Sequence, residues 1–449
     1  MTINSKEKKI YEDNQSAVSF YILFAFQFLL VAGGMFVNIK TGISTSLLVL
    51  LMTPFILSRC SSLNFDLSRI RNGMTGLFVF LCVFYLLEIG NPNNVQEAWN
   101  ISITHYAIYP IAMAILVPVA IRDRKGIEWL LFIWSVFILI ASMKGYWQKN
   151  HGFNQQELYF LYTMGGYRTH LIWSGIRYFS FFSDAANYGV HSAMGLTVFA
   201  ISALLVRSKW MKIYFAVIAI AAAYSVGISG TRSAMAIPLV GLTMYAFISK
   251  SVKSITISLI TLGAVFCFFY FTNIGDSNQY IRKMRSAFHP TEDASYLVRV
   301  ENRKKMKELM ADRPFGYGVG LSKGARFEPK ELMPYPPDSW LVSVWVETGI
   351  VGLVLYLVVH GALFACCAWI LLFKIKNKHL RGLLAAWLCM NAGFFAAAYA
   401  NDVMQYPNSI VVYTGFSLCF AGPYIDKVML EEDRQKKERK KNNSSDKHE

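Results

Sequence analysis

The passage that sets the organisation of this chain reads Tyr296-Leu-Val-Arg299-Val-Glu301-Asn-Arg303, then Arg313-Pro-Phe-Gly316-Tyr-Gly318-Val-Gly320, then Pro336-Pro-Asp338-Ser339-Trp340-Leu341, with Glu347, Gly349 and Gly352 after it. It belongs to residues 273–349, the one long polar passage in a sequence that is otherwise built from apolar blocks. We therefore expect the apolar blocks to form a frame that holds this passage.

The composition indicates what kind of frame this is. The chain has 449 residues, of which 54% are apolar, and its mean hydropathy is +0.36. Apolar runs of about 20 residues recur along the whole length, and each can cross the hydrocarbon core of a bilayer as a helix. The runs are continuous rather than alternating, so they predict helices and not the strands of a barrel. The predicted fold class is an all-α polytopic membrane protein.

The apolar runs predict twelve membrane spans. They cover residues 17–39, 43–58, 74–90, 101–121, 127–147, 186–206, 211–229, 232–249, 254–272, 350–373, 382–400 and 409–425. The connections on one side are rich in Lys and Arg, as at 122–125 and 374–381. In the short connections on the other side, Lys40 is the only basic residue. Basic connections stay in the cytoplasm, so both termini are predicted to be cytoplasmic.

These spans divide the chain into four parts. Residues 1–272 hold the first nine spans, with an aromatic-rich outer loop at about 148–185. Residues 273–349 are a large, partly helical outer loop before the tenth span, and residues 350–425 hold the last three spans. Residues 426–449 are predicted to be a disordered cytoplasmic tail, because from residue 431 onward they are charged and lack apolar side chains.

The formal net charge of +16 does not require a nucleic-acid partner. Most of the positive charge lies in the cytoplasmic connections and the tail, where it is a topology signal and faces anionic lipid. The seven cysteines lie within or at the edge of apolar runs, and no pair of histidines or cysteines has the spacing of a metal site. We therefore expect no disulfide, no metal and no cofactor.

Two groups of arginines are candidates for binding a phosphorylated substrate. The turn Ser229-Gly-Thr-Arg232-Ser233 opens the eighth span, and a helix N-terminus with a guanidinium suits a diphosphate. The alternative is an arginine that only reaches to the membrane edge. Arg299 and Arg303 are four residues apart and share one face of a helix, for which the alternative is a solvated amphipathic helix. The cations at 282, 283 and 285 are interpreted as surface charge.

Asp338 is the candidate general base. It follows two prolines and precedes an apolar run, so it is either the N-cap of a helix or a carboxylate that takes a proton from a sugar hydroxyl. The glycines at 316–320 lack the lysine spacing and the strand–helix context of a nucleotide-binding loop. Further candidate substrate-binding residues are Arg303, Arg177, Arg168, Glu347, Ser229 and Ser339.

Together these motifs resemble the bacterial O-antigen ligase and O-antigen polymerase superfamily. The resemblance rests on residues 299–303, 313–320 and 229–233, on Asp338-Ser-Trp-Leu341 with Glu347-Thr-Gly349-Ile-Val-Gly352, and on Phe182-Ser-Asp184-Ala-Ala-Asn187. It covers roughly residues 175–360, together with the predicted topology.

The resemblance implies glycosyl transfer at the periplasmic face of the bacterial inner membrane. The donor would be a glycan on undecaprenyl diphosphate, and the acceptor a second lipid-linked glycan for a polymerase or lipid A-core for a ligase. Arg232 and Arg299 match the family arginines thought to hold the diphosphate. Asp338 stands where ligases have histidine, which favours a polymerase of O-antigen, capsule or exopolysaccharide. The bilayer and other polysaccharide-assembly proteins are the further partners expected.

The expected mechanism is inverting and independent of metal, because a diphosphate is a good leaving group whose charge arginines can offset. A ligase with the same fold is the nearest alternative. A transporter or flippase for the same lipid-linked sugars is an alternative from a different class. Transporters tend to have internal repeats and charges near the membrane midplane, whereas here no repeat is evident and the charges gather at the outer edge.

Overall fold

The computed structural model describes residues 5–37, 69–172, 175–206, 208–288, 294–323 and 327–445. The elements are, in chain order, α1 (Ser5–Val37), α3 (Gly73–Leu87), η2 (Glu88–Gly90), α4 (Gln96–Ile103), η3 (Thr104–Ile108), α5 (Tyr109–Ala120), α6 (Arg124–His151), α7 (Gln155–Leu158), η4 (Tyr159–Thr163), α8 (Tyr167–His170), β1 (Leu171–Ile172), β2 (Gly175–Ile176), α9 (Ala185–Leu205), α10 (Lys209–Ser229), η5 (Arg232–Met235), α11 (Ala236–Ile248), α12 (Val252–Phe271), α13 (Gln279–Arg285), η6 (Ser286–Phe288), α14 (Ala294–Leu309), α15 (Trp340–Trp369), η9 (Ile370–Lys374), α16 (Lys378–Ala400) and α17 (Asn408–Ser445).

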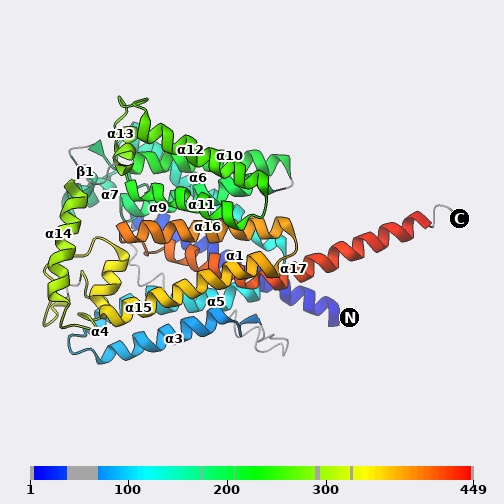
Figure 1. Cartoon of the computed structure of the whole chain (residues 1–449), viewed down its shortest axis with the longest axis horizontal. Coiled ribbons are helices and arrows are strands. Elements are labelled where there is room, and N and C mark those ends of the chain that lie inside the picture. The colour runs from blue at the N-terminus through cyan, green and yellow to red at the C-terminus, as the bar shows by residue number, and fades with distance from the viewer. Residues whose placement is uncertain are drawn as a thin grey trace.

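The long helices lie side by side in one bundle (Figure 1). Among the described residues, eight helical stretches are long and apolar enough to cross a membrane. They are Gly73–Gly90, Gln96–Ala120, Arg124–His151, Ala185–Leu205, Lys209–Ser229, Val252–Phe271, Trp340–Lys374 and Lys378–Ala400. The predicted class of a helical, multi-pass membrane protein is confirmed.

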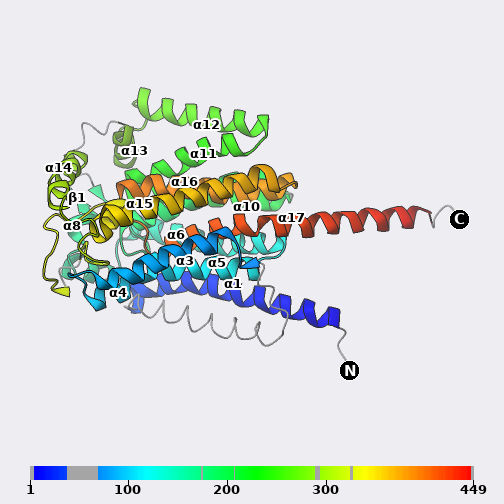
Figure 2. The same ribbon diagram turned by 60° about the horizontal axis from the view of Figure 1, so that its bottom comes forward.

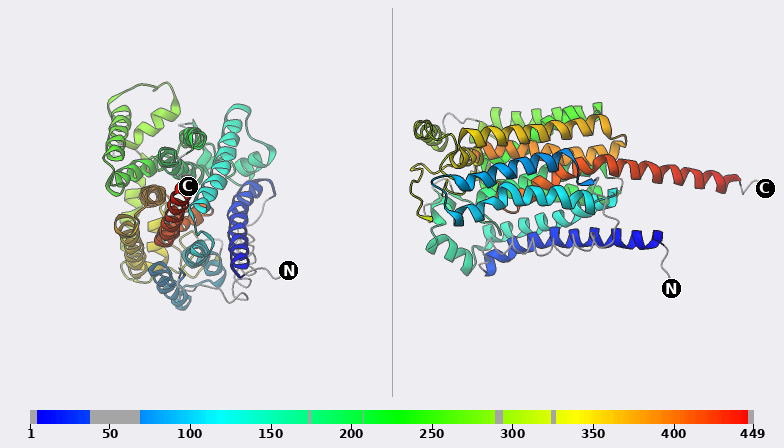
Figure 3. Two further views of the ribbon diagram at one scale, coloured as in Figure 1. Left: turned by 90° about the vertical axis from the view of Figure 1, so that its right-hand side faces the viewer. Right: turned by 90° about the horizontal axis from the view of Figure 1, so that it is seen from below.

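These eight stretches coincide with eight of the twelve predicted spans. The predicted first and eighth spans fall on two shorter apolar stretches, Ala17–Gly33 in α1 and Arg232–Ile248 in η5 and α11. The predicted twelfth span is the first part of α17, which lies in the middle of the bundle when it is viewed from the end (Figure 3). The predicted second span, 43–58, falls outside the described residues, so the total of twelve stays a prediction.

Side-chain caps define where many of these helices begin. Asp123 accepts a hydrogen bond from the Gly126 amide over 2.8 Å at the start of α6, and Asp184 accepts one from the Asn187 amide over 2.8 Å at the start of α9. Side chains also cap the first turns of α3, α10, α12 and α16, from Asn72, Ser208, Ser251 and Asn377. Each cap satisfies an amide that the helix itself leaves without a partner.

Burial separates interior helices from lipid-facing ones. In the most apolar 18-residue stretch of α9, 78% is buried inside the protein, whereas in the corresponding stretch of α12 only 6% is buried. Figure 2 shows α12 at the margin of the bundle, beyond α11. An apolar helix that leaves so much of its surface outside the protein is suited to contact with lipid, which covers apolar side chains as a protein core would.

The short elements gather at one end of the bundle, which we call the outer end. It carries α13, α14 and the β1–β2 hairpin, in which Leu171 pairs with Ile176, while both termini leave the opposite end (Figures 1 and 2). There α14 crosses the ends of the long helices instead of continuing their direction. The described helices of the polar passage, α13 and α14, therefore lie at the outer end.

The predicted start of the tenth span at 350 coincides with a break in α15 at Gly349, whose φ of 67° and ψ of −168° interrupt the helix, and a further helical stretch from Trp340 precedes the break. The tail is helical as far as Ser445 rather than disordered, since α17 continues from Asn408 without a break. Arg, Lys and Glu favour helix, and the Arg434–Glu438 pair at 3.1 Å has the spacing that stabilises one.

Candidate active site

A tight turn between α10 and η5 forms the floor of the site. Gly230 ends α10 in the left-handed conformation, with φ 59° and ψ 24°, which a glycine adopts without strain. The Ser229 hydroxyl is fully buried, donates to the Val226 carbonyl over 2.8 Å and accepts from the Thr231 amide over 3.2 Å. Ser229 therefore stabilises the turn, and the chain itself uses the hydrogen-bonding capacity of its hydroxyl.

Arg177 lies against this turn from the β2 side. Its guanidinium donates to the Ser229 carbonyl over 3.3 Å, to the Thr231 hydroxyl over 3.0 Å and to the Thr169 carbonyl over 3.2 Å. The first of these bonds satisfies a carbonyl at the C-terminal end of α10, where a cation is also favoured by the helix dipole. Arg177 thus has a structural contribution in addition to its charge.

Three arginines share this region. Burial lowers the pKa of Arg177, the carboxylate of Asp184 opposes that shift, and the positive charges of Arg232 and Arg299 add to it. Arg232 opens η5 and donates to the Ser286 hydroxyl over 3.2 Å. The fold therefore brings together cations from β2, η5 and α14, which are far apart in the sequence.

A lysine that was interpreted as surface charge belongs to the same region. Lys283 of α13 is half-buried, and burial, followed by the charges of Arg177 and Arg232, lowers its pKa to about 8. Its Nζ lies 3.2 Å from the position that a β-carbon on Gly230 would occupy. Nothing in the local pattern of charges around 282–285 distinguishes Lys283 from its neighbours, so its role could not be predicted from the sequence.

The two arginines of α14 contact the outer end of α16. Arg299 Nη1 donates to the Ala400 carbonyl over 2.7 Å, and Arg303 donates to the carbonyl of Tyr399 over 3.2 Å and to its hydroxyl over 3.0 Å. The guanidinium of Arg303 also lies 4.7 Å from the centre of the Tyr399 ring. Since the last carbonyls of a helix have no partner within it, these arginines complete the end of α16 and attach α14 to the bundle.

Asn401 connects the two arginine groups and was not identified from the sequence. Its side-chain oxygen accepts a hydrogen bond from Arg299 Nη2 over 3.4 Å, and its amide nitrogen contacts the hydroxyl of Ser233, the residue after Arg232. Its backbone carbonyl accepts from the Trp340 amide over 3.2 Å at the start of α15. A polar residue directly at the outer end of the predicted eleventh span is the only signal that could have indicated it.

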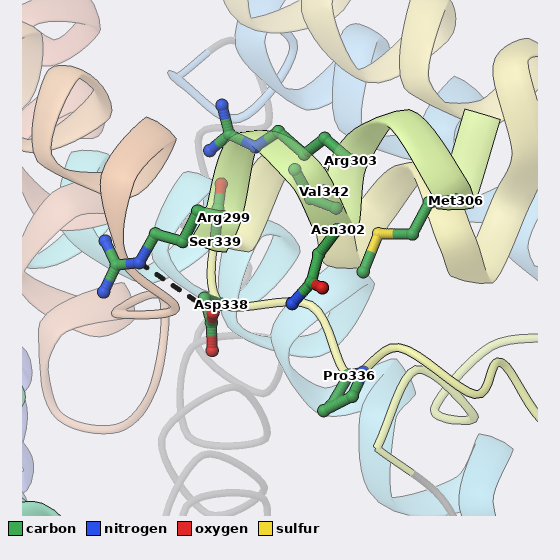
Figure 4. Close-up of a pocket in the computed structure, with 8 residues that line it drawn as sticks. All are labelled: Arg299, Asn302, Arg303, Met306, Pro336, Asp338, Ser339 and Val342. Carbon is green, nitrogen blue, oxygen red and sulfur yellow. Dashed lines mark ion pairs between the residues drawn. The ribbon is translucent and has the colours of Figure 1, made fainter. Parts of the chain in front are cut away.

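Asp338 lies beside Arg299 at the mouth of a shallow pocket (Figure 4). Its carboxylate is 3.8 Å from Arg299 Nε, and half of its side chain is exposed. The pocket is lined by Arg299, Asn302, Arg303, Met306, Pro336, Asp338, Ser339 and Val342. Because the ion pair is long and accessible to water, it contributes little to stability and leaves the carboxylate available.

The alternative interpretation of Asp338 as a helix N-cap is wrong. The N-cap residue of α15 is Ser339, whose backbone is extended at φ −132° and ψ 139°. The Ser339 hydroxyl is buried and donates to the Ala398 carbonyl over 3.1 Å, so it joins α15 to α16. Asp338 stands one residue before the cap, outside the geometry in which its carboxylate would satisfy the first turn.

The glycine passage is a backbone clamp on α15. Gly316 and Gly318 have positive φ angles of 73° and 106° and run along the segment just before the break at Gly349. The Gly318 amide donates to the Glu347 carbonyl over 3.0 Å, and the Val351 amide donates to the Pro314 carbonyl over 3.2 Å. Close packing of two backbones thus accounts for the glycine at 316, where an added β-carbon would lie 2.5 Å from the Gly349 nitrogen, without a phosphate ligand.

Glu347 fastens this clamp to the bundle. Its side chain is buried, one carboxylate oxygen accepts from the Tyr106 hydroxyl over 2.8 Å, and the other accepts from the Ser322 hydroxyl over 2.5 Å. Arg168, in contrast, is exposed on α8, with its guanidinium 5.9 Å from the centre of the Tyr167 ring. The predicted site residues therefore separate into a cationic cluster with Asp338, structural residues such as Glu347, and an exposed Arg168.

Within the described part of the chain, no group of three or more His, Cys, Asp or Glu side chains has an arrangement suited to a metal ion. The chemistry that the described side chains can supply at this part of the outer end is a concentration of positive charge beside the accessible carboxylate of Asp338. Such a site suits an anionic substrate whose charge increases as a bond breaks.

The bundle and this cationic site define a multi-pass membrane protein that can bind an anionic group at one membrane surface. Residues 191–357 match the family model described as O-antigen ligase, a stretch that includes Arg232, Lys283, Arg299 and Asp338. This match supports the resemblance of the chain to the O-antigen ligase and polymerase superfamily, whose members are glycosyltransferase-like enzymes acting on lipid-linked glycans. No match was found among curated proteins.

Proposed function

We propose that this protein polymerises glycan repeat units of O-antigen, capsule or exopolysaccharide, using a donor linked to undecaprenyl diphosphate at the periplasmic face of the inner membrane. The observation that carries the proposal is the convergence of Arg177, Arg232 and Arg299 at the outer end, next to the accessible carboxylate of Asp338. In this topology both termini are cytoplasmic, and the outer end faces the periplasm.

The three arginines are assigned to the diphosphate of the donor. Guanidinium groups bind phosphate oxygens through charge-assisted hydrogen bonds, and they retain their charge throughout the physiological pH range. Their interaction strengthens as negative charge accumulates on the leaving diphosphate, so it lowers the barrier and does more than hold the substrate. The lipid-facing helices beside the site, such as α12, are compatible with a donor whose prenyl chain stays in the bilayer.

Asp338 is assigned to the acceptor. Its carboxylate takes the proton of the attacking hydroxyl while the hydroxyl oxygen forms a bond to the anomeric carbon of the donor sugar. The bond from that carbon to the phosphate oxygen breaks, and its electron pair leaves with undecaprenyl diphosphate. A single displacement from the face opposite the diphosphate inverts the anomeric centre, and no step requires a metal.

A ligase that transfers the finished glycan to lipid A-core is the second candidate, and the description of the matching family model favours it. The residue at the candidate base position favours the polymerase, because Asp338 stands where the ligases that this chain resembles have histidine. The two activities use the same donor chemistry and differ in the acceptor.

A deletion strain separates the two candidates. Its lipopolysaccharide and capsule are profiled, lipid-linked glycans are extracted in parallel, and the strain is complemented with wild type or Asp338→Ala. Single repeat units that accumulate on the lipid carrier or on core would support the polymerase. Long chains on undecaprenyl diphosphate, with none on core, would support the ligase. Unchanged pools of both kinds would rule out glycosyl transfer.

A further inference from the structure

Lys283 is placed toward the arginine cluster by the short helix α13. Asn278 caps this helix by accepting from the Tyr280 amide over 2.9 Å, and the side chains of Tyr280 and Met284 are buried beneath it. Lys283 then lies over the turn at Gly230, with its Cδ 3.3 Å and its Nζ 3.2 Å from the site of an added β-carbon. The missing side chain at Gly230 therefore leaves the space that the lysine stem occupies.

The neighbouring cations of α13 are used differently. Arg282 is exposed and donates to the Asp276 carbonyl over 3.1 Å, and Arg285 forms an ion pair with the Asp276 carboxylate. Lys283 has no carboxylate within 4.0 Å among the described residues, although it is the half-buried member of the three. A half-buried ammonium that faces two arginines is destabilised unless an anion joins them.

The charged groups that face Lys283 show why its ammonium is destabilised. Arg177 from the β2 side and Arg232 from η5 both carry positive charge, and they oppose the ammonium after burial itself. Lys149 of α6 adds a further cation near α13, with its Nζ 5.0 Å from the centre of the Tyr280 ring. Asp184 acts on Arg177. An anionic ligand would supply the partner that Lys283 lacks among the described residues.

We infer that Lys283 is a donor-binding residue that supplies a further cation to the phosphate site formed by Arg177, Arg232 and Arg299. This inference rests on the proposed function. Its ammonium binds a phosphate oxygen of the prenyl diphosphate as a compact point charge, whereas the arginines bind through planar forks. The site thus recognises a diphosphate through two kinds of cation beside the Gly230 turn, where Lys283 Nζ and Arg177 Cγ lie 3.2 Å and 3.4 Å from the position of an added β-carbon.

The inference is tested with full-length protein in nanodiscs of neutral phosphatidylcholine and with undecaprenyl diphosphate as the probe. Lys283→Met is expected to weaken binding roughly tenfold or more, because a charge-assisted hydrogen bond is lost, and Lys283→Arg is expected to retain most of the affinity. Arg282→Met is the matched control, since it removes a positive charge from the same helix outside the cluster. Size-exclusion profiles and melting temperatures of all variants establish that they fold.

Two further probes identify the source of the phosphate. Phosphatidylglycerol and inorganic pyrophosphate are expected to displace undecaprenyl diphosphate only weakly. If either of them displaces it at a comparable concentration, Lys283 binds any anion, and the assignment to the donor is overturned. Wild-type affinity in folded Lys283→Met would overturn the role of Lys283 alone, provided that wild type binds the probe. A wild-type protein that fails to bind undecaprenyl diphosphate would remove the proposed function together with this inference.

Discussion

Gly316 and Gly349 pack backbone against backbone with no room for a side chain on either residue. A β-carbon on Gly316 would lie 2.5 Å from the Gly349 nitrogen, and one on Gly349 would lie 2.6 Å from the Gly316 nitrogen and 2.0 Å from the Pro314 carbonyl oxygen. These contacts join the polar passage to the break in α15. They therefore hold the segment at 314–316 against the point at which α15 is interrupted.

Replacement of Gly349 by alanine is expected to destabilise the protein. The backbone conformation there is one that only glycine adopts readily, at a cost of about 1–3 kcal/mol for other residues, and the added methyl group also meets the Pro314 carbonyl. A melting temperature in detergent several degrees below wild type is expected. Gly361→Ala is the control on the same helix, because nothing lies within 4 Å of its added β-carbon, and its melting temperature should not fall.

Asp338→Asn is expected to lower the transfer rate by about 10²–10⁴-fold, because the amide cannot accept the proton of the acceptor hydroxyl. Its melting temperature should stay close to wild type, since the pair with Arg299 is long and half exposed. Transfer is measured with a purified lipid-linked donor. The exposed Asp312, beyond the end of α14, provides a control in Asp312→Asn, and equal rates for the two variants would remove Asp338 as the base.

Arg232→Ala and Arg299→Ala are each expected to lower kcat by roughly 10²–10³-fold, because a group that stabilises the leaving diphosphate is lost. The effect should appear in kcat as well as in KM, as expected for interactions that strengthen in the transition state. Lys307→Ala removes an exposed cation from α14 and serves as control. Losses confined to KM would show that the arginines only bind the donor.

Donor binding is expected to weaken as the pH rises through about 8. The pKa of Lys283 is lowered to about 8 by burial and by the charges of Arg177 and Arg232, so below that value the lysine carries its charge and above it the charge is lost. A bound diphosphate raises the pKa of Lys283, so the decline in binding should appear as a rise in the KM for the donor and as a lower rate at low donor concentration. Lys283→Arg stays charged and should flatten the profile, and an unchanged profile would remove the lysine as its source.

Turnover is expected to persist in excess EDTA, because arginines rather than a metal offset the charge of the diphosphate in the proposed mechanism. The measurement is the rate of glycan transfer by purified protein before and after chelation, with added Mg²⁺ and Mn²⁺ as separate arms. A rate that collapses with EDTA and returns with one of these ions would contradict the metal-independent mechanism.

The long helices could be predicted from the sequence because an apolar run of about 20 residues has few alternatives in a bilayer. The starts of α6 and α9 also follow local signals, since Asp123 is a cap four residues before the apolar run that begins at Ile127, and Asp184 is a cap directly before Ala185. The break at Gly349 coincides with the predicted start of the tenth span at 350, but the helical stretch from Trp340 to the break was assigned to the polar passage, because the first residues of that stretch follow Asp338 and two prolines.

Of the candidate site, the arginines could be predicted from their residue type and their position at the ends of spans. The contributions of Lys283 and Asn401 could not, because they arise from contacts between segments that are far apart in the sequence. The cap interpretation of Asp338 failed by one residue, which is the usual precision of a helix boundary from sequence. Local patterns therefore identified the charges, and tertiary packing determined which of them meet.

The contact between Arg299 and the Ala400 carbonyl sets a condition on how the proposed donor enters. Arg299 already donates to that carbonyl and to the Asn401 side chain. A diphosphate must therefore accept from the N–H groups of Arg299 that these contacts leave over, or displace one of the contacts and so weaken the attachment of α14 to α16. Arg303 donates to Tyr399 one turn away and attaches α14 to α16 through a second set of contacts.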